Sequence, residues 1–451
     1  MPQPTQRQLF AVPQGGPMVQ DVQEPDGEGC GTPRLRYANR DQIEFRPCCW
    51  NELLPMDHEA RIVWECVAGL DLTPIEKRVK AVEGRPGHPS CDPRILMALW
   101  LYATLRGVGS ARELDRRCRE DVAFQWICGG VSVNYHTLSD FRTGHVEFLD
   151  QVLTESVAVL LQEGLVTLDR VAQDGMRVRA SAGAASFRRR PTLEEHLQQA
   201  REQVEALKAE LDSDPAEAHR RQKAARGRAV RDRAQRLQQA LEQMPTVEAK
   251  KRAGERDQAR VSSTDPEARV MKMADGGFRP AYNVQLATDT QTQIITGVDV
   301  TNSGSDLGQM APMVHQHDAR YDQVPDEMLV DGGFAKKDDI TEVSPPAGDT
   351  TVYAPVQVSR CDSRDPHTPL KDDSPAVAEW RQRMATPAAK QIYQQRASTA
   401  ECVNAIARNR GLQQFRVRGH PKVRAVILWY VLAHNLMRAV ALRAARDQRV
   451  T

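Results

Sequence analysis

The spacing of apolar residues changes near residue 165, and this change constrains the fold more than any other feature of the chain. From about residue 55 to 164 apolar residues recur at helical spacing, whereas 166–172 is a short β-branched and apolar run typical of a strand. Strand-like segments follow at 281–287, 294–300, 328–330 and 350–354, and helical ones at 306–320, about 376–408 and 423–445. This order predicts an all-α region followed by an α/β domain with a mixed sheet.

Glycines and capping residues divide the helical region, 45–164. An apolar helix is expected over 93–105, and Ser110 with Glu113 forms a capping box for a helix over 111–120. Thr137 with Asp140 predicts the start of a long amphipathic helix that runs to about residue 163. Short helices joined by glycine turns are typical of helix-turn-helix bundles, so Thr137 and Arg142 are candidates to face a DNA groove. A capped structural helix is an equally good interpretation.

A heptad pattern interrupts the strand-like part between residues 188 and 260. Apolar residues recur there at alternating steps of about four and three on both sides of Pro215. The pattern predicts an antiparallel helical hairpin of coiled-coil type, with a basic triplet at each end. An arm that packs on itself is favoured over a dimer contact, because the two halves match in length. Residues 1–44 have no periodicity and are expected to be disordered.

Composition excludes some classes of protein. The 451 residues include nine cysteines without a C-x-x-C pair, which fits reduced thiols in a cytoplasm better than a disulfide or zinc framework. The longest apolar runs are shorter than the roughly 20 residues that span a bilayer, and no signal segment is evident, so no membrane partner is expected. The net charge is only +1, yet 396–451 holds eleven Lys and Arg against two acids. Such polarity suits phosphate and metal as partners.

Three carboxylates stand out as candidates for chemistry. Asp174 and Asp331 each come at the expected end of a short apolar strand and precede a glycine, and Glu401 lies on a helix in the basic tail. Carboxylates from different elements can converge on Mg²⁺ ions, and two such ions support in-line phosphoryl transfer. From spacing alone the alternative stays open, because an Asp-Gly after a strand is more often an ordinary turn.

Several motifs together resemble bacterial insertion-sequence transposases with a DDE site. Tyr393, Arg396 and Glu401, with Arg408 seven residues later, resemble the Tyr, Arg, Glu, Lys signature of that family. The segments that begin at Asp174 and Asp331 resemble its first and second aspartate motifs. The insertion-sequence-1182 type in particular is matched by Tyr282-Asn283-Val284-Gln285 and by the tail motifs Asn409-Arg410-Gly411-Leu412, Phe415 to Gly419 and His434-Asn435-Leu436.

The resemblance implies an RNase H-like catalytic domain over 165–187 and 261–445, with the helical insertion between its parts. It implies two Mg²⁺ ions, replaceable by Mn²⁺, held by Asp174, Asp331 and Glu401, and DNA cleavage followed by strand transfer. Tyr393, Arg396, Arg408 and Arg410 would contact DNA. The expected partners are double-stranded DNA and further copies of the chain, as a dimer or higher oligomer. Two departures are present: four residues separate Arg396 from Glu401 where the signature has three, and Arg408 replaces the usual lysine.

Alternatives to this interpretation remain. A metal-dependent nuclease of the same fold would hydrolyse DNA without joining it, and a DNA-binding derivative would keep the scaffold without turnover. His315 and His317 with Asp318 could suggest a zinc site, but residues two apart on a helix point to different faces, so a structural role is favoured.

Overall fold

The computed structural model describes residue 41 and residues 49–79, 81, 89–213, 217–357 and 364–450. The expected disordered segment 1–44 lies outside the described residues apart from Asp41. Residues 49–451 form the unit considered below. The cysteines in the described part of the chain are free thiols, as the sequence predicts.

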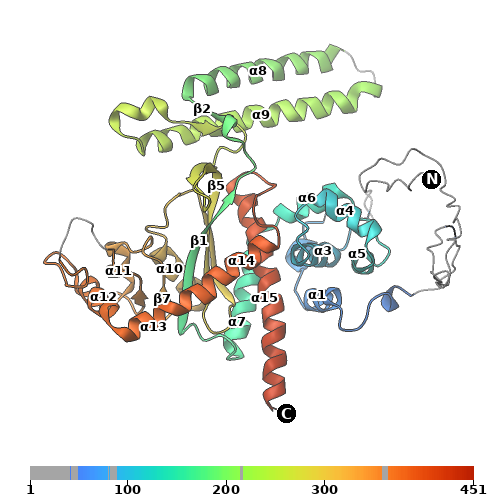
Figure 1. The fold of residues 1–451 in the computed structure, drawn as a ribbon. Helices are drawn as coiled ribbons and strands as arrows, with labels where there is room; N and C mark the ends of the chain where they lie inside the picture. Colours follow the sequence, from blue (N-terminus) through green and yellow to red (C-terminus); the bar gives the residue numbers. More distant parts are fainter. Residues whose placement is uncertain are drawn as a thin grey trace, which may run out of the picture. The chain divides into compact units, whose positions relative to one another are not determined.

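Helices make up the first part of this unit (Figure 1). They are the short 3-10 helix η1 (Trp50–Glu52), α1 (Glu59–Ala68), α2 (Thr73–Glu76), α3 (Pro93–Leu105), α4 (Ala111–Glu120), α5 (Val122–Cys128), α6 (Tyr135–Thr143) and α7 (Val146–Gln162). Helix α3 has the expected bounds and is buried along almost its whole length. The Ser110 side chain accepts a hydrogen bond from the Glu113 amide and caps α4, so this part of the capping prediction is confirmed.

The prediction of one long helix that starts at Thr137 is wrong. Asn134 is the N-cap of α6, since its side chain accepts hydrogen bonds from the amides of His136 and Thr137. Asparagine is a strong N-cap residue and lies three positions earlier, so the helix begins sooner. The chain then leaves helical geometry at His145, whose φ is −134° and ψ is 44°, and this separates α6 from α7.

A mixed sheet follows, formed by β1 (Arg170–Arg179), β4 (Arg269–Lys272), β5 (Phe278–Asp289), β6 (Ile295–Thr301), β7 (Glu327–Leu329) and β8 (Thr351–Tyr353). Strand β5 pairs antiparallel with β1, and along its other edge with β4 and then β6. Strands β7 and β8 continue from β1 in parallel. The order β6–β5–β1–β7–β8 is the mixed order expected for an RNase H-like sheet.

Strand β1 is longer than the sequence indicates. The expected strand ended before Asp174, but β1 pairs with β5 continuously from Val171, opposite Asp289, to Arg179, opposite Ala281. Asp174 therefore lies in the middle of a strand, opposite Leu286, and not at a strand end. The polar sequence after Asp174 hides this continuation, because its side chains find partners on the neighbouring strand and loop.

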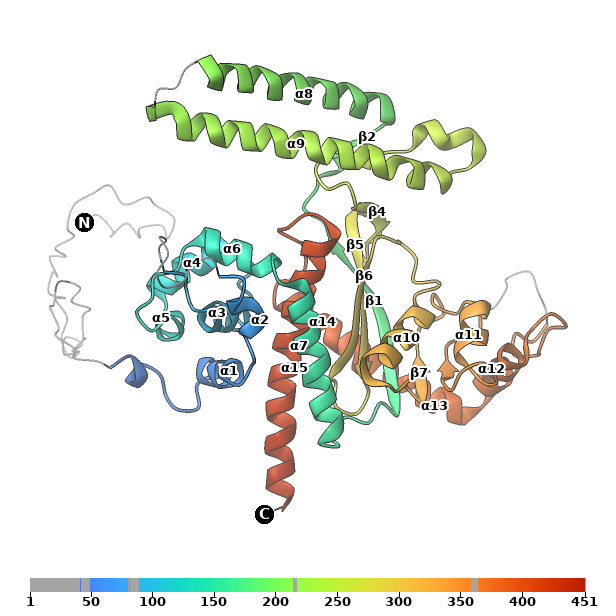
Figure 2. The same cartoon turned by 180° about the vertical axis from the view of Figure 1, so that it is seen from behind.

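Helices surround the sheet: α10 (Met310–Tyr321), α11 (Lys337–Val343), α12 (Pro375–Ala385), α13 (Pro387–Arg396), α14 (Cys402–Asn409) and α15 (His420–Val450). Helix α15 contacts β6, α7 and α3, and so joins the sheet to the helical region (Figure 2). By length and composition alone α15 could cross a membrane, but 61% of its most apolar stretch is buried inside the protein, as in the core helices that pass the same test.

The inserted segment forms a pair of long helices, α8 (Arg190–Ser213) and α9 (Glu217–Ala249), which run side by side in opposite directions (Figures 1 and 2). Flanking them are the short elements η2 (Ala184–Ser186), β2 (Phe187–Arg188), η3 (Ala253–Gln258) and β3 (Val261–Ser262). The pair has an apolar core of its own, separate from the main one, built from Leu193, Leu197, Ala200, Leu237, Ala240, Met244, Ala259 and Val261. Pro215, the expected turn residue, lies outside the described residues.

Candidate active site

Asp174 is held on β1 by two side chains from the helices that follow β8. Its Oδ1 accepts a hydrogen bond from Arg396 Nη2 at 2.8 Å, and its Oδ2 accepts one from Asn404 Nδ2 at 2.8 Å. The side chain is 18% exposed. Burial raises the pKa of the Asp174 carboxyl, while the Arg396 guanidinium acts to lower it. The carboxylate is thus fixed in direction and still reaches the surface.

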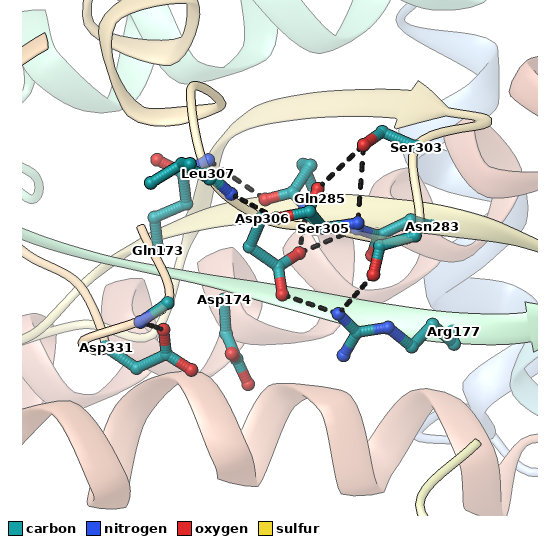
Figure 3. Close-up of polar contacts among 12 residues, drawn as sticks. Gln173, Asp174, Arg177, Asn283, Gln285, Ser303, Ser305, Asp306, Leu307 and Asp331 are labelled. Atoms are coloured by element: carbon teal, nitrogen blue, oxygen red, sulfur yellow. Dashed lines mark hydrogen bonds and ion pairs between the residues drawn. The ribbon is translucent and has the colours of Figure 1, made fainter. Parts of the chain in front are cut away.

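Asp331 lies in the turn after β7, two residues beyond the end of the strand. Its Oδ1 accepts a hydrogen bond from the Gly333 amide at 2.7 Å, which folds the loop back on its own carboxylate (Figure 3). A Cβ on Gly333 would stand 2.9 Å from that oxygen, so the second glycine of the motif makes room for the carboxylate. Oδ2 stays free of this turn, and the side chain is 40% exposed.

Glu401 ends a π turn, Ala397–Glu401, that connects α13 to α14. In an α-helix, residues four apart share a face, whereas residues five apart differ by about 140°. A π turn closes an i→i+5 hydrogen bond and so fits more residues into one turn, which brings residues five apart closer to a common face. The extra residue between Arg396 and Glu401 is accommodated in this way, and both side chains face the same side of the helix.

The guanidinium of Arg396 joins the three carboxylates. Its Nη2 lies 2.8 Å from Asp174 Oδ1 and 3.9 Å from Asp331 Oδ2, and its Nη1 lies 3.7 Å from Glu401 Oε1. We call Asp174, Asp331 and Glu401 the acidic triad. Its members come from a strand, a loop and a helix, and the first and last are more than 200 residues apart in the sequence. The fold brings all three carboxylates within 4.0 Å of the Arg396 guanidinium.

A buried polar cluster lies beside the triad on the other face of β1. Asp306 accepts hydrogen bonds from Asn283 Nδ2 at 2.6 Å, Gln285 Nε2 at 2.8 Å and Arg177 Nη2 at 2.8 Å (Figure 3). The Asp306 carboxylate packs directly on Gly175, where a Cβ would overlap its Oδ1. The absence of a side chain at Gly175, the glycine after the first aspartate, therefore leaves room for the Asp306 carboxylate.

The donor chemistry of the triad fits a hard divalent cation. All the converging atoms are carboxylate oxygens, the ligands that Mg²⁺ and Mn²⁺ prefer. The guanidinium at their centre is a positive charge in the place where such a cation would be attracted. Among the described residues, no three His, Cys, Asp or Glu side chains already stand close enough together to hold a metal. The residues fit the ion, but the carboxylates are spread around Arg396.

Two family models match parts of the chain. One is described as a transposase domain (DUF772) and matches residues 48–144, and the other is described as a transposase DDE domain and matches residues 364–440. The second includes Glu401, the third member of the acidic triad, and Arg396, which contacts all three members. The chain thus contains two segments that match transposase domains, which is consistent with a DDE transposase of an insertion sequence. No curated protein and no solved structure matches it.

Asp174 and Asp331 lie outside both matched segments of the chain, so their place in the site depends on the geometry above. The DDE domain implies an RNase H-like fold, and the observed strand order agrees with it. The helical residues 48–144 correspond to the first matched domain.

A basic groove lies beside β1. It is a cavity of about 630 Å³ whose lining includes Gly175 and the basic side chains Arg177, Arg179, Lys272, Arg279 and Arg408, with Asp275 as its acidic residue. Asp275 is paired with Arg279, at 2.8 Å. Arg408 is exposed. The groove therefore presents several basic side chains to solvent beside β1.

The other sequence candidates have different surroundings. Tyr393 is half-buried on α13 near Arg396, and burial raises the pKa of its hydroxyl. Arg410 is half-buried, and its backbone carbonyl accepts a hydrogen bond from Tyr430. Thr137 lies in the first turn of α6 and is partly exposed. These three positions are near the surface but are not gathered in one place.

Arg142 is placed in the interior. Its side chain donates to the Gly109 carbonyl at 2.7 Å and lies over the Trp100 ring, 4.7 Å from its centre. Burial lowers the pKa of its guanidinium to about 10. This environment suits a structural arginine that holds α6 against α3, and does not present it to a DNA groove.

The suggested histidine cluster is separated, as the helical spacing predicts. His317 is fully buried on α10 between Thr296 and the Met313 carbonyl, while His315 is exposed and contacts Glu342. Burial lowers the pKa of His317 to about 4, so it is neutral inside the protein.

Sequence reasoning missed Asn404 and Asp306. Asn404 follows Glu401 by three residues, so the two share a helix face, a signal that was available. Asp306 had no local signal, because its role depends on two strands that reach it from elsewhere in the chain.

Proposed function

We propose that the protein cleaves DNA at the ends of its own insertion sequence, of the 1182 type, and transfers the cut strands by metal-dependent phosphoryl transfer. The observation that supports this most directly is the convergence of the acidic triad on the guanidinium of Arg396, at the middle of an RNase H-like sheet. Asp174, Asp331 and Glu401 would hold two Mg²⁺ ions, which Mn²⁺ can replace. When bound, such ions stabilise the attacking and leaving oxygens of an in-line displacement at phosphorus.

The residues around the triad have separate tasks in this proposal. Asn404 and the Gly333 amide each bind one oxygen of an aspartate and leave its second oxygen directed to the centre. Such fixed carboxylates reduce the reorganisation needed when substrate binds. Glu401 is 63% exposed and completes the site from the solvent side, where the scissile strand would enter.

The basic groove would hold the DNA backbone. Phosphate contacts position a strand without reading its sequence, and Lys and Arg provide them. Since Gly175, one of its lining residues, directly follows the first aspartate along β1, a strand held in the groove would lie close to the triad. Arg408 would serve here as the family lysine does, with a fork that binds phosphate at two points. Tyr393 and Arg396 would contact phosphate near the scissile bond. Arg410 and Thr137 stay secondary candidates for DNA contact, and the burial of Arg142 removes it from this set.

Assembly on DNA is part of the proposal. Two element ends have to be held together before joining, which favours a dimer or higher oligomer. The α8–α9 pair would act as a coiled-coil arm that contacts an element end or a second protomer, because it packs on its own core and needs no other support.

The alternatives differ in their products. A nuclease of this fold would leave cut DNA without joined strands, and a binding-only derivative would leave DNA intact. The presence of all three carboxylates argues against the binding-only derivative. The deciding experiment incubates the protein with labelled DNA that carries the inverted repeats flanking its gene, with target DNA and Mg²⁺. Joined products support the proposal, cut but unjoined DNA supports the nuclease, and unchanged DNA supports the binding-only derivative.

A further inference from the structure

Arg396 occupies a position that a DNA-contacting residue would not require. Its side chain is only 10% exposed, and its ionic contacts within the described residues are with the acidic triad. A side chain that served only to bind phosphate would be directed to the basic groove. The arginine instead stands in the centre of the carboxylates.

The oxygens that face Arg396 are those that a metal would need. Asp174 Oδ2 is taken by Asn404 and Asp331 Oδ1 by the Gly333 amide, so the remaining oxygen of each aspartate is the one turned to the guanidinium. Glu401 presents Oε1 to the same group. A guanidinium and a divalent cation therefore compete for one set of oxygens.

The guanidinium is not fully satisfied in this position. Its Nε is buried and has no hydrogen-bond partner within the described residues, and the same holds for Asn404 Oδ1 beside it. Buried polar atoms of a permanent structural network are usually paired. These two atoms beside the triad are thus left for a group that binds there.

From these contacts we infer that Arg396 is an internal counter-ion of the metal-free site, which a divalent cation must displace from the acidic triad. The inference rests on the proposed metal-binding role of the triad. In the free protein, Arg396 keeps three converging carboxylates from repelling one another. When a cation binds, the guanidinium leaves, and a DNA phosphate is the natural anion for it to contact next. The motif arginine thus acts at both sites in turn, and it is a positioning residue for the triad.

The turn that carries Arg396 explains why it can reach all three acids. Without the π turn, the five-residue spacing would direct Arg396 and Glu401 to different faces of the helix. With it, one guanidinium spans a helix, a loop and a strand. The extra residue relative to the family signature therefore preserves this contact.

The test measures Mn²⁺ affinity in the absence of DNA, from the loss of the free-ion signal in electron paramagnetic resonance. A neighbouring opposite charge changes proton affinity by about ten- to a thousandfold, so removal of a competing charge should tighten Mn²⁺ binding by about tenfold or more. We expect Arg396→Gln to bind Mn²⁺ most tightly, Arg396→Lys less tightly and the wild type least. Lysine keeps the charge but cannot span three carboxylates with one compact ammonium.

Controls separate this inference from the proposed function. Arg383 on α12 is paired with Glu379 at 2.9 Å, away from the triad, so Arg383→Gln should leave Mn²⁺ affinity unchanged. Adding Asp174→Asn to Arg396→Gln should abolish the tight binding. If the double variant still binds Mn²⁺ tightly, the triad is not the metal site and the proposed function fails.

If Arg396→Gln binds Mn²⁺ no more tightly than the wild type while Asp174→Asn abolishes binding, the triad stands and the counter-ion inference is overturned. Should Arg396→Gln fail to fold without metal, the comparison of Arg396→Lys with the wild type decides. Tighter Mn²⁺ binding by the lysine variant supports the inference, and equal or weaker binding overturns it.

Discussion

Replacing Gly175 with alanine places a methyl group in space that the Asp306 carboxylate already fills. The added Cβ would overlap Asp306 Oδ1 and would stand 2.7 Å from Gln285 Nε2 and 2.8 Å from Asp306 Cγ. Neither neighbour can withdraw easily, because both side chains are buried and hydrogen-bonded to each other. Strand β1 has to shift, or the polar cluster has to break.

The size of the effect follows from these two responses. Overpacking of a filled interior destabilises by about 1–3 kcal/mol. Withdrawal of Asp306 would leave Asn283 and Gln285 without their acceptor, at about 1–3 kcal/mol for each buried donor. The smaller penalty is a shift of β1, so we expect Gly175→Ala to lower the free energy of unfolding by about 1–3 kcal/mol. Asp174, the next residue, would move with the strand.

Urea unfolding followed by circular dichroism measures this loss, and a double-mutant cycle with Asp306→Ala assigns its cause. Removing the carboxylate makes room for the methyl group, so the double variant should lose about 1–3 kcal/mol less than the two single changes added together. Gly183→Ala is the matched control: its φ is −90°, and nothing lies within 4 Å of an added Cβ. A change within about 0.5 kcal/mol is expected there.

The reasoning would be refuted if Gly175→Ala were as well tolerated as Gly183→Ala. It would also be refuted if the effects of Gly175→Ala and Asp306→Ala were additive, because two side chains in contact must show coupling.

Three further predictions concern the site and its surroundings. Changing each carboxylate of the triad to its amide should abolish cleavage of labelled DNA in Mg²⁺, while DNA binding in a gel-shift assay persists. Full cleavage activity in any one variant would remove that residue from the site. Arg408→Gln should reduce the slope of log DNA affinity against log salt concentration by about 0.9, whereas a change of the half-buried Arg410 should reduce it less. If Arg408→Gln kept the wild-type slope, the groove would not be the DNA-binding surface. Burial lowers the pKa of both His317 and His434 to about 4. In the unfolded chain these histidines take up protons near their ordinary pKa of about 6.5, before the folded ones do, so the free energy of unfolding should fall by about 2 kcal/mol for each between pH 7 and pH 5. The fall would be seen as a lower urea midpoint. His→Gln variants should flatten this pH dependence, and an unchanged pH dependence in those variants would contradict the prediction.

Elements whose signals are local were predictable from the sequence. Helix α3 has strong apolar character bounded by Pro93 and the following glycines, and Ser110 caps α4 as expected. The order of strands and helices was also readable, because apolar runs of strand length alternate with helical periods. Thr137 failed as a cap since Asn134, a residue with the same capability, precedes it.

Features that depend on distant partners were not predictable. The length of β1 is set by pairing with β5, about a hundred residues away, and the polar residues after Asp174 become strand residues only in that context. Arg142 has a charged side chain of the kind that contacts DNA, but Trp100 and the loop at Gly109 cover it. The extra residue before Glu401 was visible as a departure from the signature, yet its meaning required the π turn.

The separate core of the α8–α9 pair has a consequence for how the chain reaches its native state. Strands β1 and β5 are neighbours in the sheet, but about a hundred residues of chain lie between them. Closing so long a loop is entropically unfavourable and slows folding. A helical pair that forms early from local contacts brings its two ends together, at β2 and β3, and so shortens the effective loop. Substitutions that weaken this pair should therefore slow refolding of the catalytic sheet more than they accelerate its unfolding.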